Sequence, residues 1–247
     1  IHADGGQVIL QASAAGDIFS SVVNQSGVIR ARSLTHEDGI VRLDGGDSGQ
    51  VTVAGTIDAS GPASGQTGGR VSLLGESVTL TPTVRIDVSG AGGGGTALIG
   101  GQFQGRGTEP TATTTLVADR ASISADALTQ GTGGTVIVWA DGHTQYAGTI
   151  SAQGGASGGH GGFVEVSGKQ ALDFTGRVDT TAPAGRTGTL LLDPSNITIS
   201  SAANANISAA PTFTGTTATS TLNVTTLQTA LATNNVIVDT TSPFASA

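Results

Sequence analysis

The chain has no cysteine, and aromatic and charged residues make up only 3% and 11% of its 247 residues. Without cysteine, disulfide bonds and thiolate metal sites are excluded. Such a composition is also found in disordered chains. Here, however, the hydrophobic fraction of 37% consists mainly of Val, Ile, Leu and Ala in short runs that a folded core can bury. We therefore predict a folded chain.

Basic residues and long apolar runs are scarce as well. The formal net charge is −8, which argues against nucleic acid or an anionic membrane surface as a partner. No apolar run approaches the roughly 20 residues that a membrane-spanning helix needs, so no membrane insertion is expected. The first residues, Ile1–Asp4, lack the basic and apolar parts of a signal peptide. We expect the chain to be a segment of a longer protein or a processed product.

Short apolar segments recur between the abundant glycines. One set of segments ends at equivalent positions that follow one another by 28, 29, 37, 27 and 28 residues: Ile29, Ile57, Ile86, Ile123, Ile150 and Val178. A second set steps by 30, 27, 38 and 28 residues: Val41, Val71, Leu98, Val136 and Val164. The clearest pair is 133–160 against 161–188. Two sets that share a period of about 28 residues indicate one structural coil per period.

The segments have the character of strands, because apolar and polar residues alternate over four to six positions and Val and Ile are enriched. A single coil cannot bury its inner face, so stacking coils into a parallel β-helix is the favoured fold. A β-sandwich is the alternative, but a sandwich does not require a constant period. The glycine-rich stretches 90–95 and 154–159 recur at one phase of the repeat, and we interpret them as tight corners rather than flexible linkers.

Two regions depart from the repeat. The enlarged steps locate one insertion, the polar stretch 105–115, which we predict to be a loop that protrudes from the solenoid wall. We assign residues 1–200 to the β-helix and 201–247 to a C-terminal segment. The period is lost after Pro194, where we predict one more strand over 196–199. In the C-terminal segment we predict a helix over 226–232 with Thr225 as candidate N-cap, and a strand over 236–238. The segment either caps one end of the rod or begins another module.

Several sequence strings resemble a known family: Val23–Ala31, Gly133–Asp141, Gly161–Lys169 and Gly188–Pro194. They are similar to the large exoproteins of two-partner secretion systems, the filamentous-haemagglutinin-like adhesins. The resemblance covers about residues 5–200 and continues weakly through 227–238. It implies a right-handed β-helix, export through an outer-membrane two-partner transporter and a place on the bacterial cell surface. The family's amino-terminal secretion domain is not evident, so the chain resembles the segment downstream of it.

Several titratable side chains are candidates for a metal-binding or catalytic site. His143, His160 and Asp141 are candidate metal ligands, but solvated turn histidines are the preferred interpretation. Asp58, Asp87 and Asp179 share one phase of the repeat, with Ser124 and Ser151 interrupting the row. Paired carboxylates can hydrolyse glycans, yet capping of coil corners is the preferred role for these residues. Asp44 and Asp47 flank two glycines and are a weak candidate for calcium.

The remaining candidates concern surfaces. Trp139 either points outward as a sugar-stacking residue would or packs beside a loop, which is favoured; Tyr146 is the other large polar aromatic residue. Asn-x-Ser/Thr sequons occur at Asn24, Asn196, Asn206 and Asn223, and we attribute them to chance. Three threonines, Thr52, Thr79 and Thr81, keep no shared phase, which argues against an ice- or surface-binding ladder.

We therefore predict no catalytic residue, no cofactor-binding residue and no metal-binding residue. The expected function is that of a non-catalytic, adhesive segment of a large secreted bacterial surface exoprotein, forming a stiff rod. Its expected partners are the transporter during export and a glycan or protein on a host or neighbouring cell. The alternative is a β-helix polysaccharide lyase or glycoside hydrolase.

Overall fold

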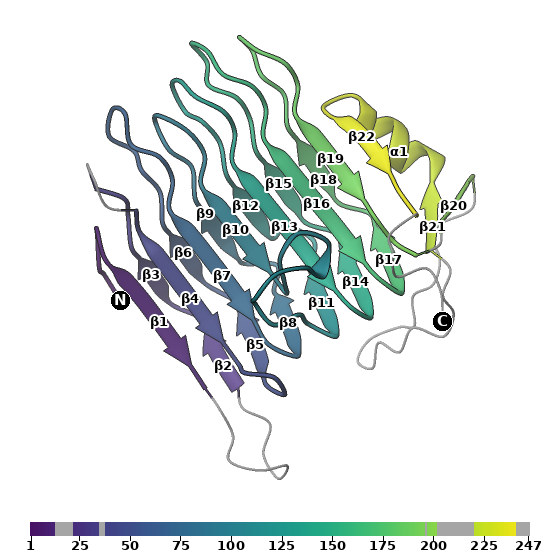
Figure 1. Cartoon of the computed structure of the whole chain (residues 1–247), viewed down its shortest axis with the longest axis horizontal. Helices are drawn as coiled ribbons and strands as arrows, with labels where there is room; N and C mark the ends of the chain where they lie inside the picture. Colours follow the sequence, from purple (N-terminus) through teal and green to yellow (C-terminus); the bar gives the residue numbers. More distant parts are fainter. Residues whose placement is uncertain (13–21, 35–37, 196, 202–219, 241–247) are drawn as a thin grey trace.

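The computed structural model describes residues 1–12, 22–34, 38–195, 197–201 and 220–240. Three long parallel sheets dominate it, and successive strands of the chain belong to different sheets in rotation (Figure 1). From β1 (Gln7–Gln11) to β16 (Phe163–Gly168), each strand therefore pairs with the strand three positions further along the chain. The predicted all-β architecture of parallel, β-helix-like strands is confirmed.

The first sheet is formed by β1 (Gln7–Gln11), β4 (Ile40–Asp44), β7 (Arg70–Leu74), β10 (Thr96–Ile99), β13 (Thr135–Ala140), β16 (Phe163–Gly168), β19 (Thr189–Leu192) and β22 (Asn235–Val238). The second is formed by β2 (Val22–Gln25), β5 (Gln50–Val53), β8 (Ser77–Leu80), β11 (Thr114–Val117), β14 (His143–Tyr146) and β17 (Ala171–Phe174). The third is formed by β3 (Val28–Arg30), β6 (Thr56–Asp58), β9 (Arg85–Asp87), β12 (Ser122–Ser124), β15 (Thr149–Ser151) and β18 (Arg177–Asp179).

The core is a set of aliphatic columns that run through the stack. The column from Ile29 to Val178 pairs in register at every step of the third sheet, as the period predicts. The expected register of the first sheet is wrong at one coil, because Val71 pairs with Ala97 and not with Leu98. Leu98 alternates to the outer face, since neighbouring residues of a strand point to opposite sides.

Glycines permit close approach of the coils at one corner. Gly69, Gly95, Gly134, Gly162 and Gly188 each precede a strand of the first sheet. A Cβ atom on any of them would lie 2.0–2.1 Å from the carbonyl oxygen of the corresponding glycine one coil earlier. None of these five has a positive φ. Steric contact therefore requires glycine in this column, whereas positive φ occurs at Gly93, Gly158 and Gly159 in the stretches interpreted as corners.

The inserted loop spans 100–113, between β10 and β11, and includes the short 3-10 helix η1 (Phe103–Gly105). The prediction that it protrudes from the wall is wrong: the loop lies in front of the first sheet (Figure 1). Side chains of that sheet hold it there, as described below. Thr114 and Thr115 were assigned to the loop but belong to β11.

The C-terminal segment adds a last layer to the stack. β20 (Ile197–Ser200) precedes it, and the segment contains β21 (Ser220–Asn223), which pairs with β20, and α1 (Val224–Leu231) before β22. The helix N-cap is Asn223, whose side-chain oxygen accepts a hydrogen bond from the Thr225 amide at 2.8 Å, so the choice of Thr225 is wrong. β22 pairs in register with β19, and α1 contacts β18. Among the described residues, the only α-helix is too short to cross a membrane.

Candidate functional site

An apolar cluster outside the core lies beneath the inserted loop. Leu98, Ile137 and Trp139 point outward from β10 and β13, and Phe163 of β16 packs against them. Trp139 is only 1% exposed, because Gly101 and Gly105 of the loop lie directly over its indole ring. The indole N–H donates to Asp141 at 3.3 Å. Of the two interpretations of Trp139, packing beside a loop is confirmed.

Two carboxylates are buried at the edge of this cluster. Glu165 is 0% exposed and Asp193 is 1% exposed. Gln104 of the loop joins them: its backbone N–H donates to the Glu165 carboxylate at 3.1–3.2 Å, and its side-chain amide donates to Asp193 Oδ2 at 3.0 Å. Within the described residues, Asp193 Oδ1 has no hydrogen-bond partner. The loop and the sheet are thus tied together by buried acids.

Burial changes the acidity of both groups. Desolvation raises the pKa of Glu165 to about 7, against the hydrogen bonds from Gln104 and Ser167, and the nearby Asp193 adds to the rise. Burial also raises the pKa of Asp193, opposed by the hydrogen bond from Gln104 and aided by Asp239. Glu165 can therefore hold a proton near neutral pH. Because the loop covers both acids, they have no surface that a polysaccharide can reach.

A second anchor holds the far side of the loop. The Arg42 guanidinium donates to Glu109 Oε2 at 2.7 Å and to Asp44 Oδ2 at 2.7 and 3.1 Å. Within the loop, the Gln102 side-chain oxygen accepts hydrogen bonds from the amides of Thr108 and Glu109 at 3.0 and 3.3 Å. Charge-assisted hydrogen bonds of this kind are stronger than neutral ones, so the loop is fixed at both sides.

Between the anchors the loop leaves an open hollow, here named the loop pocket, with a volume of about 530 Å³. It is lined by Arg70, Leu98, Gln102, Phe103, Arg106, Gly107, Thr135, Ile137 and Phe163. Phe103 is 46% exposed and meets Phe163 edge to face, with ring centroids 5.7 Å apart. The loop pocket is the candidate functional site, because a preformed concave surface of apolar and a few polar groups suits ligand binding.

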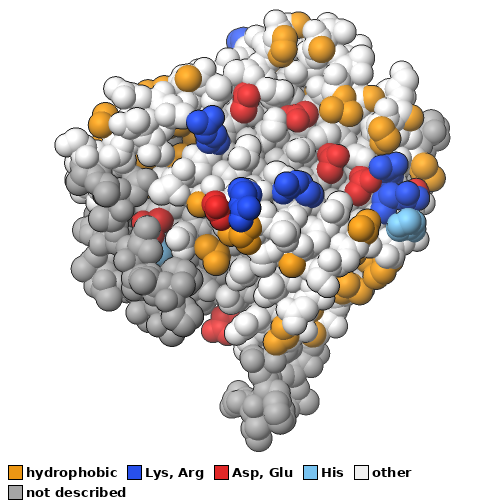
Figure 2. All heavy atoms as spheres, turned by 180° about the vertical axis from the view of Figure 1, so that it is seen from behind, with side chains coloured by type: hydrophobic (Ala, Val, Ile, Leu, Met, Phe, Trp, Pro, Cys, Tyr) orange, Lys and Arg blue, Asp and Glu red, His pale blue; other side chains and the backbone are white. Residues whose placement is uncertain are grey.

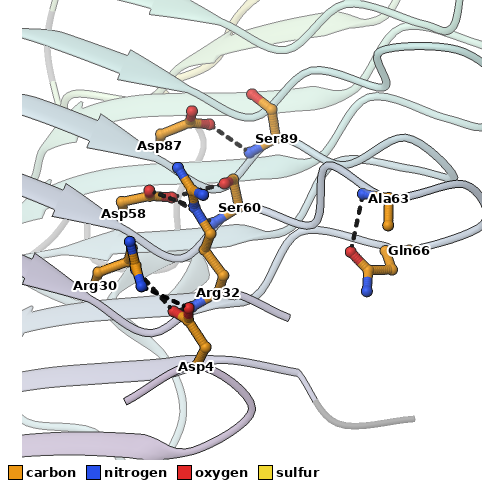
Figure 3. A network of polar contacts seen from close by, with 9 residues as sticks. All are labelled: Asp4, Arg30, Arg32, Asp58, Ser60, Ala63, Gln66, Asp87 and Ser89. Atoms are coloured by element: carbon orange, nitrogen blue, oxygen red, sulfur yellow. Dashed lines mark hydrogen bonds and ion pairs between the residues drawn. The ribbon is translucent and has the colours of Figure 1, made fainter. Parts of the chain in front are cut away.

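The aspartates of the third sheet cap coil corners, as the preferred interpretation predicts. Asp58 pairs in register with Asp87. Asp58 accepts from the Ser60 amide and hydroxyl and from Arg32, and Asp87 accepts from the Ser89 amide at 2.8 Å (Figure 3). Asp179 accepts from the Thr181 amide at 2.9 Å.

Ion pairs accompany this row of caps. Burial opposes ionisation of Asp58, but the hydrogen bonds from Ser60 and Arg32 outweigh it and lower the pKa of that carboxyl. Arg30 pairs with Asp4 at 2.9 Å, in the same network. Acidic and basic side chains lie close together in a band on the rear face of the molecule (Figure 2). The carboxylates are therefore matched by local donors and cations.

The histidines do not come together. His143 was expected to be a solvated turn residue, but it lies in β14, is 6% exposed and bonds through Nε2 to Asp173 Oδ2 at 2.8 Å. His160 is exposed, as expected, and its Nδ1 accepts from the Arg186 amide at 3.1 Å. Asp141 accepts instead from the Thr111 hydroxyl. No group of three His, Asp or Glu residues in the described ranges is arranged to hold a metal ion.

The remaining candidates also have structural surroundings. Asp44 accepts from Arg42 and from the Gly46 amide at 2.9 Å. Tyr146 is fully buried and stacks on Phe174 at 5.3 Å. Thr52 pairs with Thr79, but Thr81 lies outside this row and Leu116 follows Thr79 in it. The three threonines therefore keep no shared phase through the coils, as predicted.

The sequons fall in different surroundings. Asn24 lies in the edge strand β2, and Asn223 caps α1. Asn196 and Asn206 lie outside the described residues.

Sequence reasoning missed Glu165, Asp193 and Gln104. Glu165 occupies an outward position of a strand and reads as a solvated residue until the loop is placed over it. The sequence holds a weak signal for the place of Asp193, which lies 26 residues after Ser167 and so at the same phase of the repeat. In the structure, the Asp193 amide donates to the Ser167 hydroxyl at 3.2 Å. Gln104 lies in the insertion, for which the period makes no prediction.

Comparison with known proteins adds no family assignment. No protein-family model matches the chain, and no curated protein sequence matches it significantly.

Proposed function

We propose that this chain is a non-catalytic, adhesive segment of a large secreted bacterial surface exoprotein, built as a stiff right-handed β-helix. The proposal includes export through an outer-membrane two-partner transporter. The proposed binding partner is a glycan or protein on a host or neighbouring cell. The sequence strings that resemble filamentous-haemagglutinin-like adhesins motivate the secretion and surface parts of this proposal.

The observation that carries the proposal is the continuous register of the stack. The aliphatic column from Ile29 to Val178 passes through six strands without a break, and the other sheets keep the same order. Such a stack is stabilised by contacts between neighbouring coils and can extend in either direction. A rod that presents a loop on one side is suited to holding a binding surface away from a cell.

A polysaccharide lyase or hydrolase remains the second candidate, and the paired acids Glu165 and Asp193 are the observation that favours it. A raised carboxyl pKa is typical of a general acid in glycosidases. Both acids are covered, however, and Gln104 occupies their hydrogen-bonding positions. The partly buried row of Asp58 and Asp87 is engaged in corner caps. These contacts favour the structural role.

Two measurements on the same purified chain separate these functions. Beads coated with the chain should bind cells or an arrayed glycan without shortening any polysaccharide in a reducing-end assay. The variant Asp87→Asn should leave this binding unchanged, and Glu165→Gln tests the second candidate acid for any cleavage. Cleavage of a polysaccharide by the chain, lost in either variant, would overturn the adhesive proposal.

A further inference from the structure

The loop pocket has a continuous apolar wall. Phe103 comes from the inserted loop and Phe163 from β16, and their rings meet at 64° above Leu98 and Ile137. Aromatic residues are only 3% of the chain, so two at one open pocket are a local concentration. Phe103 is exposed and Phe163 is partly buried, and adjoining apolar groups at a surface mark interaction sites more often than isolated ones do.

Positive charge gathers at the same pocket. The chain has 10 Lys and Arg residues in all and a net charge of −8, yet Arg70 and Arg106 both line this hollow. The Arg70 guanidinium is 3.9 Å from Glu109, beyond hydrogen-bond length, and its side chain is 41% exposed. Arg70 thus has donors available to a ligand. A planar guanidinium suits two parallel hydrogen bonds to a carboxylate.

The loop that builds the pocket is held in advance of any ligand. Gln104 is hydrogen-bonded to Glu165 and Asp193, and Glu109 is hydrogen-bonded to Arg42, while Phe103 of the same loop is exposed to solvent. A site that is ordered before binding loses less conformational entropy when the ligand arrives. The anchors therefore present Phe103 and Arg106 instead of merely closing a gap in the wall.

We propose that the loop pocket binds a sugar residue that carries a carboxylate, as in a uronate- or sialate-containing glycan. The inference rests on the proposed adhesive function and names the ligand class of the candidate site. The C–H face of the sugar ring lies against Phe103 and Phe163, and its carboxylate lies at Arg70. Gln102 and Thr135 offer polar groups to the ring hydroxyls.

The mixed character of the pocket favours a sugar over other anions. A fatty acid would need a deeper apolar channel than this open hollow, whereas a pyranose ring has one apolar face and a polar rim. A volume of about 530 Å³ lies within the usual range of roughly 300–1,000 Å³ for ligand sites. An acidic peptide with an aromatic side chain is the competing ligand, and the test includes it.

The test is isothermal titration calorimetry of the full 247-residue chain. The probes are trigalacturonate, its methyl ester, 3′-sialyllactose, lactose and the peptide acetyl-Phe-Glu. Each acidic sugar should bind at least about tenfold more tightly than its uncharged partner, equivalent to about 1.4 kcal/mol. Higher salt should weaken binding of the acidic sugars, because the carboxylate contact is electrostatic.

Matched variants locate the binding. Arg70→Ala and Phe103→Ala should each weaken binding of the acidic sugars about tenfold. Arg120→Ala and Leu128→Ala, which remove an exposed arginine and an exposed hydrophobic side chain elsewhere, should have no effect. Thermal unfolding by circular dichroism verifies that all four variants fold. Folding is expected because each replaced side chain is substantially exposed.

Four results would overturn the inference: equal affinity for the acid and its ester, unchanged affinity in both pocket variants, no binding of either acidic sugar, or binding of acetyl-Phe-Glu alone. The bead assay separates these failures from failure of the proposed function. Unchanged cell binding by Arg70→Ala and Phe103→Ala rejects the pocket and leaves the adhesive function standing. Absence of cell binding by the unmodified chain rejects the adhesive function itself.

Discussion

The interior of the stack and the outer face beneath the inserted loop are both fully buried, but they are built from different residues. In the interior, aliphatic side chains recur at the same position of successive coils, for example Ile57, Ile86 and Ile123. The loop-covered face buries Trp139, Glu165 and Asp193 on the outer side of the first sheet. The interior is therefore stabilised by a repeated pattern, and the covered face by contacts that occur once.

This difference predicts how the effect of an amino-acid replacement depends on its position. A replacement in a column disturbs coils on both sides, because each coil packs only on its neighbours. A replacement under the loop disturbs the loop and the pocket it forms. Five substitutions, compared with one another or with matched controls, measure this contrast.

The largest effect is expected at the glycine column. Gly134→Ala places a Cβ atom 2.1 Å from the Gly95 carbonyl oxygen, which forces neighbouring coils apart. We expect a loss of about 4 kcal/mol or more in the free energy of unfolding, measured by urea denaturation. Gly27→Ala is the matched control, since its Cβ atom would meet nothing within 4 Å. Equal stability of the two variants would show that the coils can separate without cost.

A truncation in each region compares the two kinds of burial directly. Leu73→Ala opens a cavity inside the stack and should cost about 4 kcal/mol. Leu98→Ala lies under the edge of the loop, which can settle into the space, and should cost about 2 kcal/mol. Urea denaturation measures both. A larger loss for Leu98→Ala would mean that the loop contributes more stability than the core column.

Glu165 makes the covered face sensitive to pH. The pKa of Glu165 is about 7 in the folded chain, against an ordinary value of 4.5, which applies to the unfolded chain. The unfolded chain therefore releases this proton at lower pH than the folded chain does. Stability is therefore lost between about pH 4.5 and 7 and stays low above that window. Glu165→Gln should remove this dependence and gain about 3 kcal/mol relative to the parent at pH 8.

The measurement is urea denaturation of parent and variant from pH 4 to pH 8. Glu76→Gln, at an exposed residue, is the matched control. A stability difference between the parent and Glu165→Gln that does not change with pH would contradict the expected titration.

The smallest effect is expected at the coil corners. Asp87→Ala removes the hydrogen bond to the Ser89 amide and should cost about 1 kcal/mol. Asp119→Ala removes only an exposed ion pair with Arg120 at 3.6 Å and should change stability by less than about 0.5 kcal/mol. A shift of the thermal midpoint is a sufficient readout. A neutral Asp87→Ala would show that water replaces the cap.

The sequence by itself determined the features that repeat. The spacing of Ile57, Ile86 and Ile123 predicted their register, and the phase of Asp58 and Asp87 predicted their corner caps, because a period carries information about neighbours one coil away. The sequence pattern did not predict the strands of the second sheet, because strands such as β14 (HTQY) have a weak apolar pattern. The shift at Leu98 was missed because Ala97, which faces the core in its place, is a small residue.

Only the tertiary structure decided what happens at the insertion. The polar stretch between β10 and β11 has no periodic partner, so its sequence says nothing of where it lies. Folded over the first sheet, it buries Trp139 and Glu165, raises the pKa of Glu165, and brings Phe103 beside Phe163, 60 residues along the chain. Burial and acidity depend on which segments exclude water, and that is a property of the assembled chain, whereas the strand pattern is written locally.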